Sequence, residues 1–524
     1  MMGINGFRAA LLAAGAVLAA FATPALAASD TVRIRTNSDL RSIDPGVNRD
    51  LNTDLVLQHV IEGLVAFKED ATIAPMLAKS VDVSDDGTVY TFTLRDDVKF
   101  HNGATMSIDD VLFAWKRYMD PATDWFCRPQ FAPGGSSGVK SVEADGSDKV
   151  VFTLEKPSAL FLFNMARFDC GATAIYHRDS IEADGKITQK LIGTGPYKLS
   201  DWRRGQYIGL SRFDEYSALP GEMDGYAGNK TPKTPNVRFM IIPDSAAAKT
   251  ALLAGNLDID WQIDPSQIAD YEKAAGVKVE SFMGTGITFI AFQTRDPKLS
   301  DVRIRKAIEL SLDYPQMVAA VSDGRAEASR SFVPRVSPFY KEAQAVPAVR
   351  DIEKAKALLA EAGYKGEPIM VLTNRQYPEM HDIAILAQAM ALEAGINLQI
   401  DITDFATHGD RLRRGAYEMQ VFGYGSRIDP FLIYDAATTA DKTKEPNKIW
   451  ENAEAKAIVM KTQAVADLAE RQKLFDELEV MFRNDVPLIP VFSKVITSAA
   501  RSNVTGFKPA WTVGMPRAWS VTVE

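Results

Sequence analysis

The feature that most constrains the fold is an alternation of helical and strand patterns in the C-terminal half of the chain. From about Arg350, the expected order is helix 352–362, strand 369–373, helix 380–394, strand 397–402, helix 409–414 and strand 418–422. Gly363 and Gly395 follow the first two helices, and glycine is the residue that most often ends a helix in a left-handed conformation. Strands that alternate with helices pair in parallel, because each helix returns the chain across one face of the sheet. We therefore expect an α/β domain with a mostly parallel sheet.

The segment FGYGSRIDPF, residues 422–431, leaves the last of these strands at its carboxyl end. Ligands of open α/β sheets bind at the carboxyl ends of strands, so this segment is a candidate ligand loop. Its glycines allow a ligand to approach the backbone closely. Arg427 carries a planar fork of donors that suits a carboxylate or a phosphate. The alternative is that Arg427 pairs with Asp429 or points to solvent.

Three aromatic residues and one aspartate near expected strand ends are further candidates for ligand contacts. Phe422 and Tyr424 lie on one face of their strand if it continues through Tyr424, and that face is either a pocket wall or the core. Trp261 follows the strand pattern LDID, where it forms a second wall or packs as a half-buried residue. Asp44, in the loop after the first expected strand, either contacts a ligand or caps the following turn.

The length of 524 residues is too great for one compact core and indicates two or three domains. A strand over 31–35 and a helix over 54–64 open the N-terminal half. A helix over 107–119 and a hairpin over 139–154 follow, so this half contains a small β-rich part.

The first 27 residues have the pattern of a cleavable export signal, in which Arg8 precedes an apolar run over 9–21 and the small-x-small triplet 25–27. The run is shorter than the roughly 20 residues that span a bilayer, and no later stretch reaches that length without charges. No arginine pair precedes the run and no cysteine follows it, so neither twin-arginine export nor a lipid anchor is indicated. We expect a soluble chain that the Sec route exports to the periplasm of a Gram-negative bacterium.

Cys127 and Cys170 are the two cysteines of the chain. An exported chain meets an oxidising compartment, where paired cysteines tend to cross-link. The pair forms a disulfide or remains as two buried thiols, and the spacing does not decide because the bond needs Cα atoms within about 7 Å.

Several function classes are disfavoured by the charge and the motifs. The formal charge of -9 and a pI near 5.4 argue against nucleic acid as a partner. The five histidines are scattered singly, so no metal site is expected. The segment 134–138, GGSSG, matches the pattern around a nucleophilic serine at Ser136, but Pro133 precedes it and a strand rather than a helix follows. No nucleotide-binding motif is present either, and we expect no catalytic residue and no cofactor.

Residues 74–121 carry in order the short motifs Leu-Ala, Asp-Gly, Tyr-x-Phe-x-Leu-Arg, Lys-Phe-His-x-Gly and Asp-Val. Other motifs are spread over the rest of the chain: SIDPG (42–46), GTGPYKL (193–199), LLAGNLDI (252–259), DVRIRKAIELSLD (301–313) and NDVPLIPVF (484–492). On these motifs the chain resembles the family 5 extracellular solute-binding proteins, the peptide and nickel binders of ABC importers. The resemblance covers nearly all of the chain after the expected export signal.

The resemblance implies an α/β fold of the bilobal periplasmic-binding type, large, with an extra small domain. The implied divisions are 28–73, 193–283 and 491–524 for lobe I, 74–192 for the small domain and 284–490 for lobe II. The chain should cross between the lobes twice, near 284–294 and near 486–491. Such a pair of crossings acts as a hinge, so that a ligand which contacts both lobes favours the closed state.

The candidate ligand loop departs from the pattern of the peptide-binding relatives, which carry a Trp and an Asp before the Asp-Pro pair. That Asp takes the α-ammonium group of the peptide. This chain has Gly423 at the Trp position and Ser426 at the Asp position. The departure puts an ordinary peptide with a free amino terminus in doubt, and it makes a solute with an anionic group, such as an opine-like conjugate or a sugar phosphate, an alternative. A nickel complex is another alternative within the family.

The function implied by the resemblance is that of the substrate-binding component of an ABC importer, not an enzyme, which captures a peptide or a peptide-like small organic solute. Its expected partners are this ligand and the permease, through which the ATPase subunits act, and the chain is expected to be a monomer. A periplasmic chaperone or a sensor that binds ligands without transport is the alternative outside this class.

Overall fold

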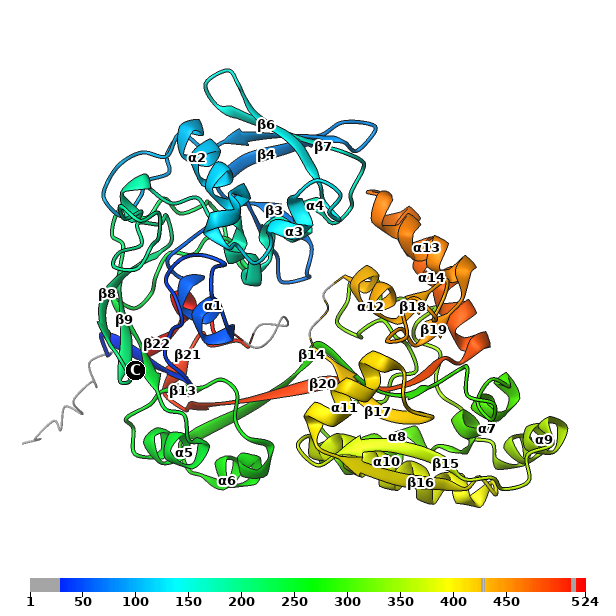
Figure 1. The fold of residues 1–524 in the computed structure, drawn as a ribbon. Helices are drawn as coiled ribbons and strands as arrows, with labels where there is room; N and C mark the ends of the chain where they lie inside the picture. The colour runs from blue at the N-terminus through cyan, green and yellow to red at the C-terminus, as the bar shows by residue number, and fades with distance from the viewer. Residues whose placement is uncertain (1–28, 426, 428, 510–514) are drawn as a thin grey trace, which may run out of the picture.

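The computed structural model describes residues 29–425, 427, 429–509 and 515–524. Figure 1 shows an N-terminal lobe on the left and a C-terminal lobe on the right, connected by the two long strands β14 (Val277–Phe292) and β20 (Leu488–Arg501). A smaller β-rich part lies above the N-terminal lobe in the same view. The expected bilobal α/β fold is confirmed.

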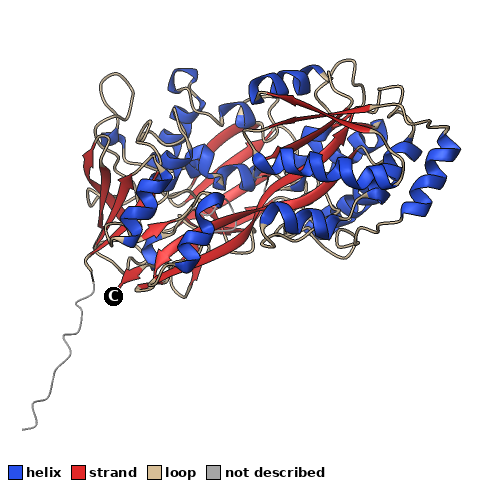
Figure 2. Ribbon diagram, turned by 90° about the horizontal axis from the view of Figure 1, so that it is seen from below, coloured by secondary structure: helices blue, strands red, loops and turns tan. Residues whose placement is uncertain are grey.

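One sheet of ten strands runs through both lobes, in the order β16-β15-β17-β14-β20-β13-β1-β12-β9-β8. Its other strands are β1 (Thr31–Thr36), β8 (Tyr197–Arg203), β9 (Tyr207–Arg212), β12 (Asn236–Ile241), β13 (Ile259–Asp260), β15 (Ile369–Asn374), β16 (Leu398–Thr403) and β17 (Met419–Tyr424). At its centre β14 and β20 are antiparallel, and their register shifts between Met283 and Ile287. Seen from below, the long strands pass diagonally through the molecule with helices along both sides (Figure 2).

The C-terminal lobe has the alternation of helix and strand that the sequence predicts. β15 pairs in parallel with both β16 and β17, and β14 is antiparallel to β17. The helices of this lobe are α7 (Val302–Ser311), α8 (Tyr314–Ser322), α9 (Ile352–Ala362), α10 (Pro378–Glu393), α11 (Phe405–Arg414), α12 (Pro430–Ala437), α13 (Ala453–Ala464) and α14 (Leu468–Asp485). α9 ends at Gly363, whose φ of 71° lies in the left-handed region that glycine adopts without strain.

The N-terminal lobe is built on β1, which is parallel to β12 and β13, while β9 pairs antiparallel with β12 and β8. Its helices are α1 (Leu51–Leu57), α5 (Ser245–Leu253) and α6 (Ile268–Lys273). The β-rich part contains the antiparallel sheet β4 (Ala78–Val83), β5 (Val89–Leu94), β7 (Lys149–Leu154) and β6 (Val139–Asp145), with α2 (Ile108–Met119), α3 (Arg128–Phe131) and α4 (Phe161–Ala166). Four two-stranded sheets complete the described structure: β2 (Val65–Phe67) with β3 (Ile73–Pro75), β10 (Met223–Asp224) with β11 (Ala227–Gly228), β18 (Thr438–Thr439) with β19 (Trp450–Glu451), and β21 (Val504–Thr505) with β22 (Thr522–Val523).

The first helix differs from its prediction, because the helix expected over 54–64 is α1, which begins at Leu51 and ends at Leu57. Asp50 caps it by accepting a hydrogen bond from the Thr53 amide. The apolar residues that follow are buried, but the carbonyls of His59 and Val60 accept hydrogen bonds from the backbone around residues 195–197. Tertiary hydrogen bonds therefore replace the helical bonds that the apolar spacing suggested.

Cys127 and Cys170 form a disulfide, and both are fully buried. Within the described residues, no helix is both long enough and apolar enough to cross a membrane.

Candidate functional site

The candidate site is a cavity of about 530 Å³ between the two lobes, which we call the interlobe cavity. The N-terminal lobe and its β-rich part contribute Arg49, Asp54, Phe126, Phe168 and Asp169, among others. The C-terminal lobe contributes Arg427 and, from α12, Leu432 and Asp435. The volume lies within the range of about 300 to 1,000 Å³ that is usual for small-molecule sites.

The start of α1 places an ion pair on the wall of the interlobe cavity. Arg49 precedes the helix and Asp54 lies in its first turn, so the guanidinium folds back onto the carboxylate, with Nε 3.2 Å from Oδ1 and Nη2 in contact with Oδ2. The guanidinium also lies over the Phe126 ring, 5.7 Å from its centroid. Burial raises the pKa of the Asp54 carboxyl to about 7 against the opposing effect of Arg49, and the nearby Asp169 and Asp50 raise it further.

The disulfide brings two other wall residues together. Phe126 precedes Cys127 and Asp169 precedes Cys170, so the bond joins the two segments that carry them. Asp169 is held by Arg167, whose Nε lies 2.9 Å from Oδ1. The wall on the N-terminal side therefore combines aromatic rings with two arginine–aspartate pairs.

The candidate ligand loop reaches the interlobe cavity through Arg427, which lies between the end of β17 and the start of α12. Ser426 is outside the described residues. Asp429 has another role, because its side chain is nearly buried, caps the Phe431 amide and accepts hydrogen bonds from Arg471 at 2.8 and 2.9 Å. The carboxylate of Asp429 is therefore held inside the C-terminal lobe rather than at the cavity.

The other sequence-predicted residues lie away from this cavity. Phe422 and Tyr424 are half-buried and pack with the aromatic core of the C-terminal lobe, where the Tyr424 ring lies 5.0 Å from that of Phe289. Trp261 is 4% exposed, and its indole N–H donates to the Arg35 carbonyl at 3.0 Å, which is the packing alternative.

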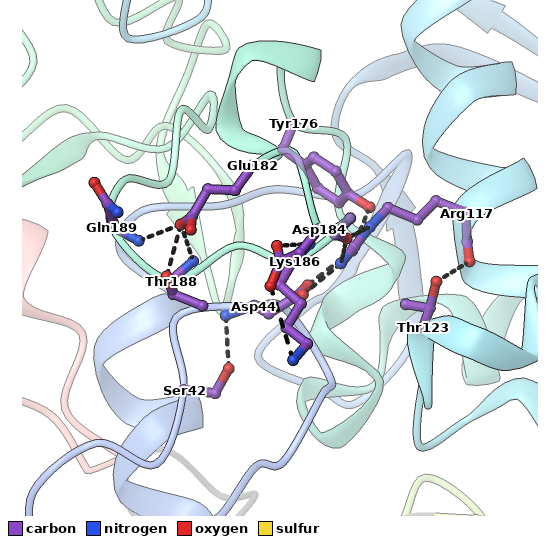
Figure 3. Close-up of polar contacts among 11 residues, drawn as sticks. Ser42, Asp44, Arg117, Thr123, Tyr176, Glu182, Asp184, Lys186, Thr188 and Gln189 are labelled. Carbon is purple, nitrogen blue, oxygen red and sulfur yellow. Dashed lines mark hydrogen bonds and ion pairs between the residues drawn. The ribbon is translucent and has the colours of Figure 1, made fainter.

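Asp44 lies beside a separate cavity of about 870 Å³ in the N-terminal half, and not beside the interlobe cavity. Its carboxylate accepts two hydrogen bonds from the Arg117 guanidinium, one of them 2.8 Å long, instead of capping the following turn (Figure 3). Arg117 also donates to the Tyr176 hydroxyl at 3.1 Å and to the Gly185 carbonyl. The Asp44–Arg117 pair thus joins the loop after β1 to α2.

Sequence reasoning did not find most residues of the interlobe cavity. Arg49 and Asp54 follow the SIDPG motif closely, and Leu432 and Asp435 follow the Asp-Pro pair by less than two helical turns, so nearness to a motif was their only signal. Phe126 and Phe168 carry no local signal, because long-range folding alone brings them to the cavity.

The part of the chain that the structure describes contains one grouping of potential metal ligands, formed by Cys127, Asp169 and Cys170. The two sulfur atoms are bonded to each other in the disulfide, so this grouping offers no thiolate to a metal ion.

Comparison with known proteins identifies relatives over most of the chain. The di/tripeptide-binding protein 4 of Pseudomonas aeruginosa is 29% identical over 482 residues, which cover 87% of this chain and 88% of the relative. The heme-binding protein A of Haemophilus influenzae is 28% identical over 477 residues, covering 86% and 84%. The crystal structure of the ABC transporter substrate-binding protein CtaP of Listeria monocytogenes matches with a TM-score of 0.79 at 26% identity, over 94% of this chain and 99% of that one.

In addition to these single relatives, the chain matches the sequence profile of a whole protein family. Residues 72–444 match the sequence profile of the bacterial extracellular solute-binding proteins, family 5 (middle region). This match spans more than half of the chain and includes most of the C-terminal lobe. The chain belongs to the family 5 bacterial extracellular solute-binding proteins.

Proposed function

We propose that this chain is the substrate-binding component of an ABC importer, and that it captures a peptide or peptide-like small organic solute in the interlobe cavity and delivers it to a membrane permease. The observation that carries the proposal is the cavity of about 530 Å³ whose walls come from both lobes. A solute held there contacts both lobes at once, so its binding favours their closed arrangement. The ATPase that drives transport is a separate chain, and this chain performs no catalysis.

The hinge of this proposal is the pair of strands β14 and β20. The bound solute lies on one side of them, and the shift in their register after Met283 supplies a place where the ladder can bend. The lobe divisions are those expected from the resemblance, with lobe II over 284–490 and the small domain over 74–192. The chain acts in the periplasm as a monomer after loss of its export signal.

The charges of the interlobe cavity support a zwitterionic solute over a purely anionic one. Three arginines line it, namely Arg49, Arg167 and Arg427, and three carboxylates do so as well, namely Asp54, Asp169 and Asp435. A peptide or peptide-like solute carries both signs and also apolar groups that suit Leu432 and the phenylalanines. Arg427 contacts the anionic group of the solute, and Phe422 and Tyr424 support the loop from behind.

The proposal is tested with ligand-stripped protein and a panel of di- to pentapeptides, opine-like conjugates, sugar phosphates and nickel complexes. A solute at about 100 times its Kd adds about 2.7 kcal/mol to the free energy of unfolding, which a thermal-shift assay detects. Small-angle X-ray scattering of the same sample should show a smaller radius of gyration when the lobes close. Arg427→Ala should weaken binding, whereas Arg413→Ala, on the exposed side of α11, should leave it unchanged. Stabilisation by a solute without any compaction would contradict capture by lobe closure.

A further inference from the structure

A second, smaller cavity lies behind the wall that the N-terminal lobe presents to the interlobe cavity. Its volume is about 40 Å³, and we call it the rear pocket. Asp54 and Phe168 line both cavities and therefore form the wall between them. One water-sized group occupies roughly 10 to 15 Å³, so the rear pocket has room for about three such groups. That is the size of the end of a short side arm of a solute.

The rear pocket contains a hydrogen-bond acceptor that lacks a donor. Gln58 is 7% exposed, and its amide Nε2 donates to the Pro516 carbonyl at 3.1 Å, which fixes the orientation of the amide. Its Oε1 is buried and has no hydrogen-bond partner among the described residues. Buried acceptors are nearly always satisfied, so this atom points to a donor that arrives from outside the chain.

A carboxylate lies on the same face of α1 as this acceptor. Gln58 directly follows the last residue of α1 and keeps a helical backbone, with its amide donating to the Asp54 carbonyl. The side chains of Asp54 and Gln58, four residues apart, therefore lie on one side of the helix, and both line the rear pocket. Asp54 is 6% exposed, and its cationic partner Arg49 lies at the interlobe cavity with part of its side chain in solvent. Arg49 can therefore release the carboxylate to a second cation without leaving the cavity wall.

The remaining walls of the rear pocket suit a cation more than a neutral group. The rings of Phe168, Tyr226 and Trp519 line it, and aromatic faces attract cations. Two of these rings already have cations of the chain beside them, with Lys230 Nζ 5.3 Å from the centroid of Trp519 and the Arg517 guanidinium carbon 5.6 Å from that of Tyr226. The pocket also holds a lysine, Lys230, but its Nζ lies 2.6 Å from a carboxylate oxygen of Glu62 and both residues are buried. That internal pair is neutral as a unit, and so is the Asp54–Arg49 pair. Of these two pairs, the second lies at the interlobe cavity, so Asp54 is the carboxylate that a solute can approach.

We propose that the rear pocket is a specificity pocket of the solute site, and that it takes a short arm ending in a primary ammonium group. The ammonium donates to the Asp54 carboxylate and to Gln58 Oε1, while Arg49 turns toward the anionic part of the solute in the interlobe cavity. The inference rests on the proposed function and specifies its substrate class as solutes with an additional ammonium group.

The test uses pairs of dipeptides that differ by a single ammonium group. Alanyl-diaminopropionate, alanyl-ornithine and alanyl-lysine are compared with alanyl-alanine, alanyl-norvaline and alanyl-norleucine by calorimetric titration of the ligand-stripped protein. A charge-assisted hydrogen bond to a buried carboxylate should make at least one ammonium-bearing member bind about tenfold or more tightly than its neutral partner. Asp54→Asn and Gln58→Leu should reduce that ratio to about twofold or less, whereas Asp214→Asn, on the exposed surface of the N-terminal lobe and outside both cavities, should preserve it.

Equal affinity within every pair, or a preference that survives Asp54→Asn, overturns the inference and leaves the proposed function intact. Retention of the wild-type circular dichroism spectrum and unfolding midpoint shows that a variant is folded, and Gln58→Leu provides a second variant should Asp54→Asn fail this criterion. If no dipeptide binds, saturation-transfer NMR with methylammonium chloride decides the inference separately. Transfer to methylammonium that Asp54→Asn abolishes supports the rear pocket, and absence of transfer overturns the inference. The proposed function is decided separately, by the wider panel of solutes.

Discussion

Removing the disulfide between Cys127 and Cys170 should lower the free energy of unfolding of the N-terminal half by about 4 kcal/mol. The bond closes a loop with a sequence separation of 43 residues. A cross-link over a loop of that length restricts the unfolded chain, and the loop-closure entropy corresponds to about 4 kcal/mol at 25 °C. The double substitution Cys127→Ala/Cys170→Ala removes the cross-link and also two fully buried sulfur atoms.

Three samples separate these two effects. Wild-type protein in reductant keeps both sulfur atoms and loses only the cross-link, so its loss relative to the oxidised protein measures the bond itself. The double alanine variant adds the loss of packing, and reductant should not change it further. Urea unfolding, followed by circular dichroism, gives the free energies, and thiol titration of the denatured protein checks the oxidation state.

The same removal should weaken solute binding, because Phe126 and Asp169 lie next to the two cysteines and line the interlobe cavity. Calorimetric titration with a solute identified in the panel measures this loss. Unfolding of the oxidised and reduced wild-type proteins at the same urea concentration would refute the reasoning. It would mean either that the bond does not form or that the reduced chain is already equally restricted.

Three other predictions concern buried groups. His59 is fully buried, donates to the Leu55 carbonyl and accepts from the Ala518 amide; burial lowers its pKa to about 3. Because the pKa of folded His59 lies below its unfolded value of 6.5, its contribution makes the free energy of unfolding fall as pH falls from 6.5 to 3, by about 1.4 kcal/mol per pH unit. Urea unfolding at pH 6.5 and 5 should show that His59→Gln removes this contribution. Parallel pH profiles of the variant and the wild type would contradict the prediction. Arg471→Met leaves the buried Asp429 carboxylate without its cation and should lower the free energy of unfolding by about 3 to 5 kcal/mol. Adding Asp429→Asn should restore part of this loss, and a double variant no more stable than the single one would contradict the importance of the ion pair. In thermal unfolding, Gly46→Ala should be more destabilising than Gly103→Ala. Both glycines have positive φ, but of the two only Gly46 would place its new Cβ against another residue, 2.6 Å from Nε1 of Trp125. Equal losses of stability would refute the steric argument.

Local patterns predicted the elements whose ends depend on neighbouring residues. The helix over 352–362 ends at Gly363 as expected, because a left-handed residue there needs no distant contact. The strand expected at 418–422 is β17, Met419–Tyr424. It lies parallel to β15, because α10 returns the chain before β16 and α11 returns it again before β17. The family motifs extended this local reading to the bilobal fold.

The start of the chain shows where local patterns fail. Apolar spacing suggested a helix over 54–64, but α1 ends at Leu57. The carbonyls of His59 and Val60 instead accept hydrogen bonds from backbone amides about 135 residues further along the chain. A hydrogen bond to so distant a partner leaves no trace in the spacing of neighbouring residues.

The sequence alone therefore determined the α/β class, the family and a loop at the end of a strand that carries Arg427. Only the tertiary structure decided which charges that loop faces. Asp429 follows Arg427 by two residues, yet its carboxylate binds Arg471 inside the lobe. Asp54 and Phe126 reach the interlobe cavity from the other half of the chain. The physical reason is that backbone propensities act over a few residues, whereas a cavity is formed by side chains that meet only when two lobes pack against shared strands.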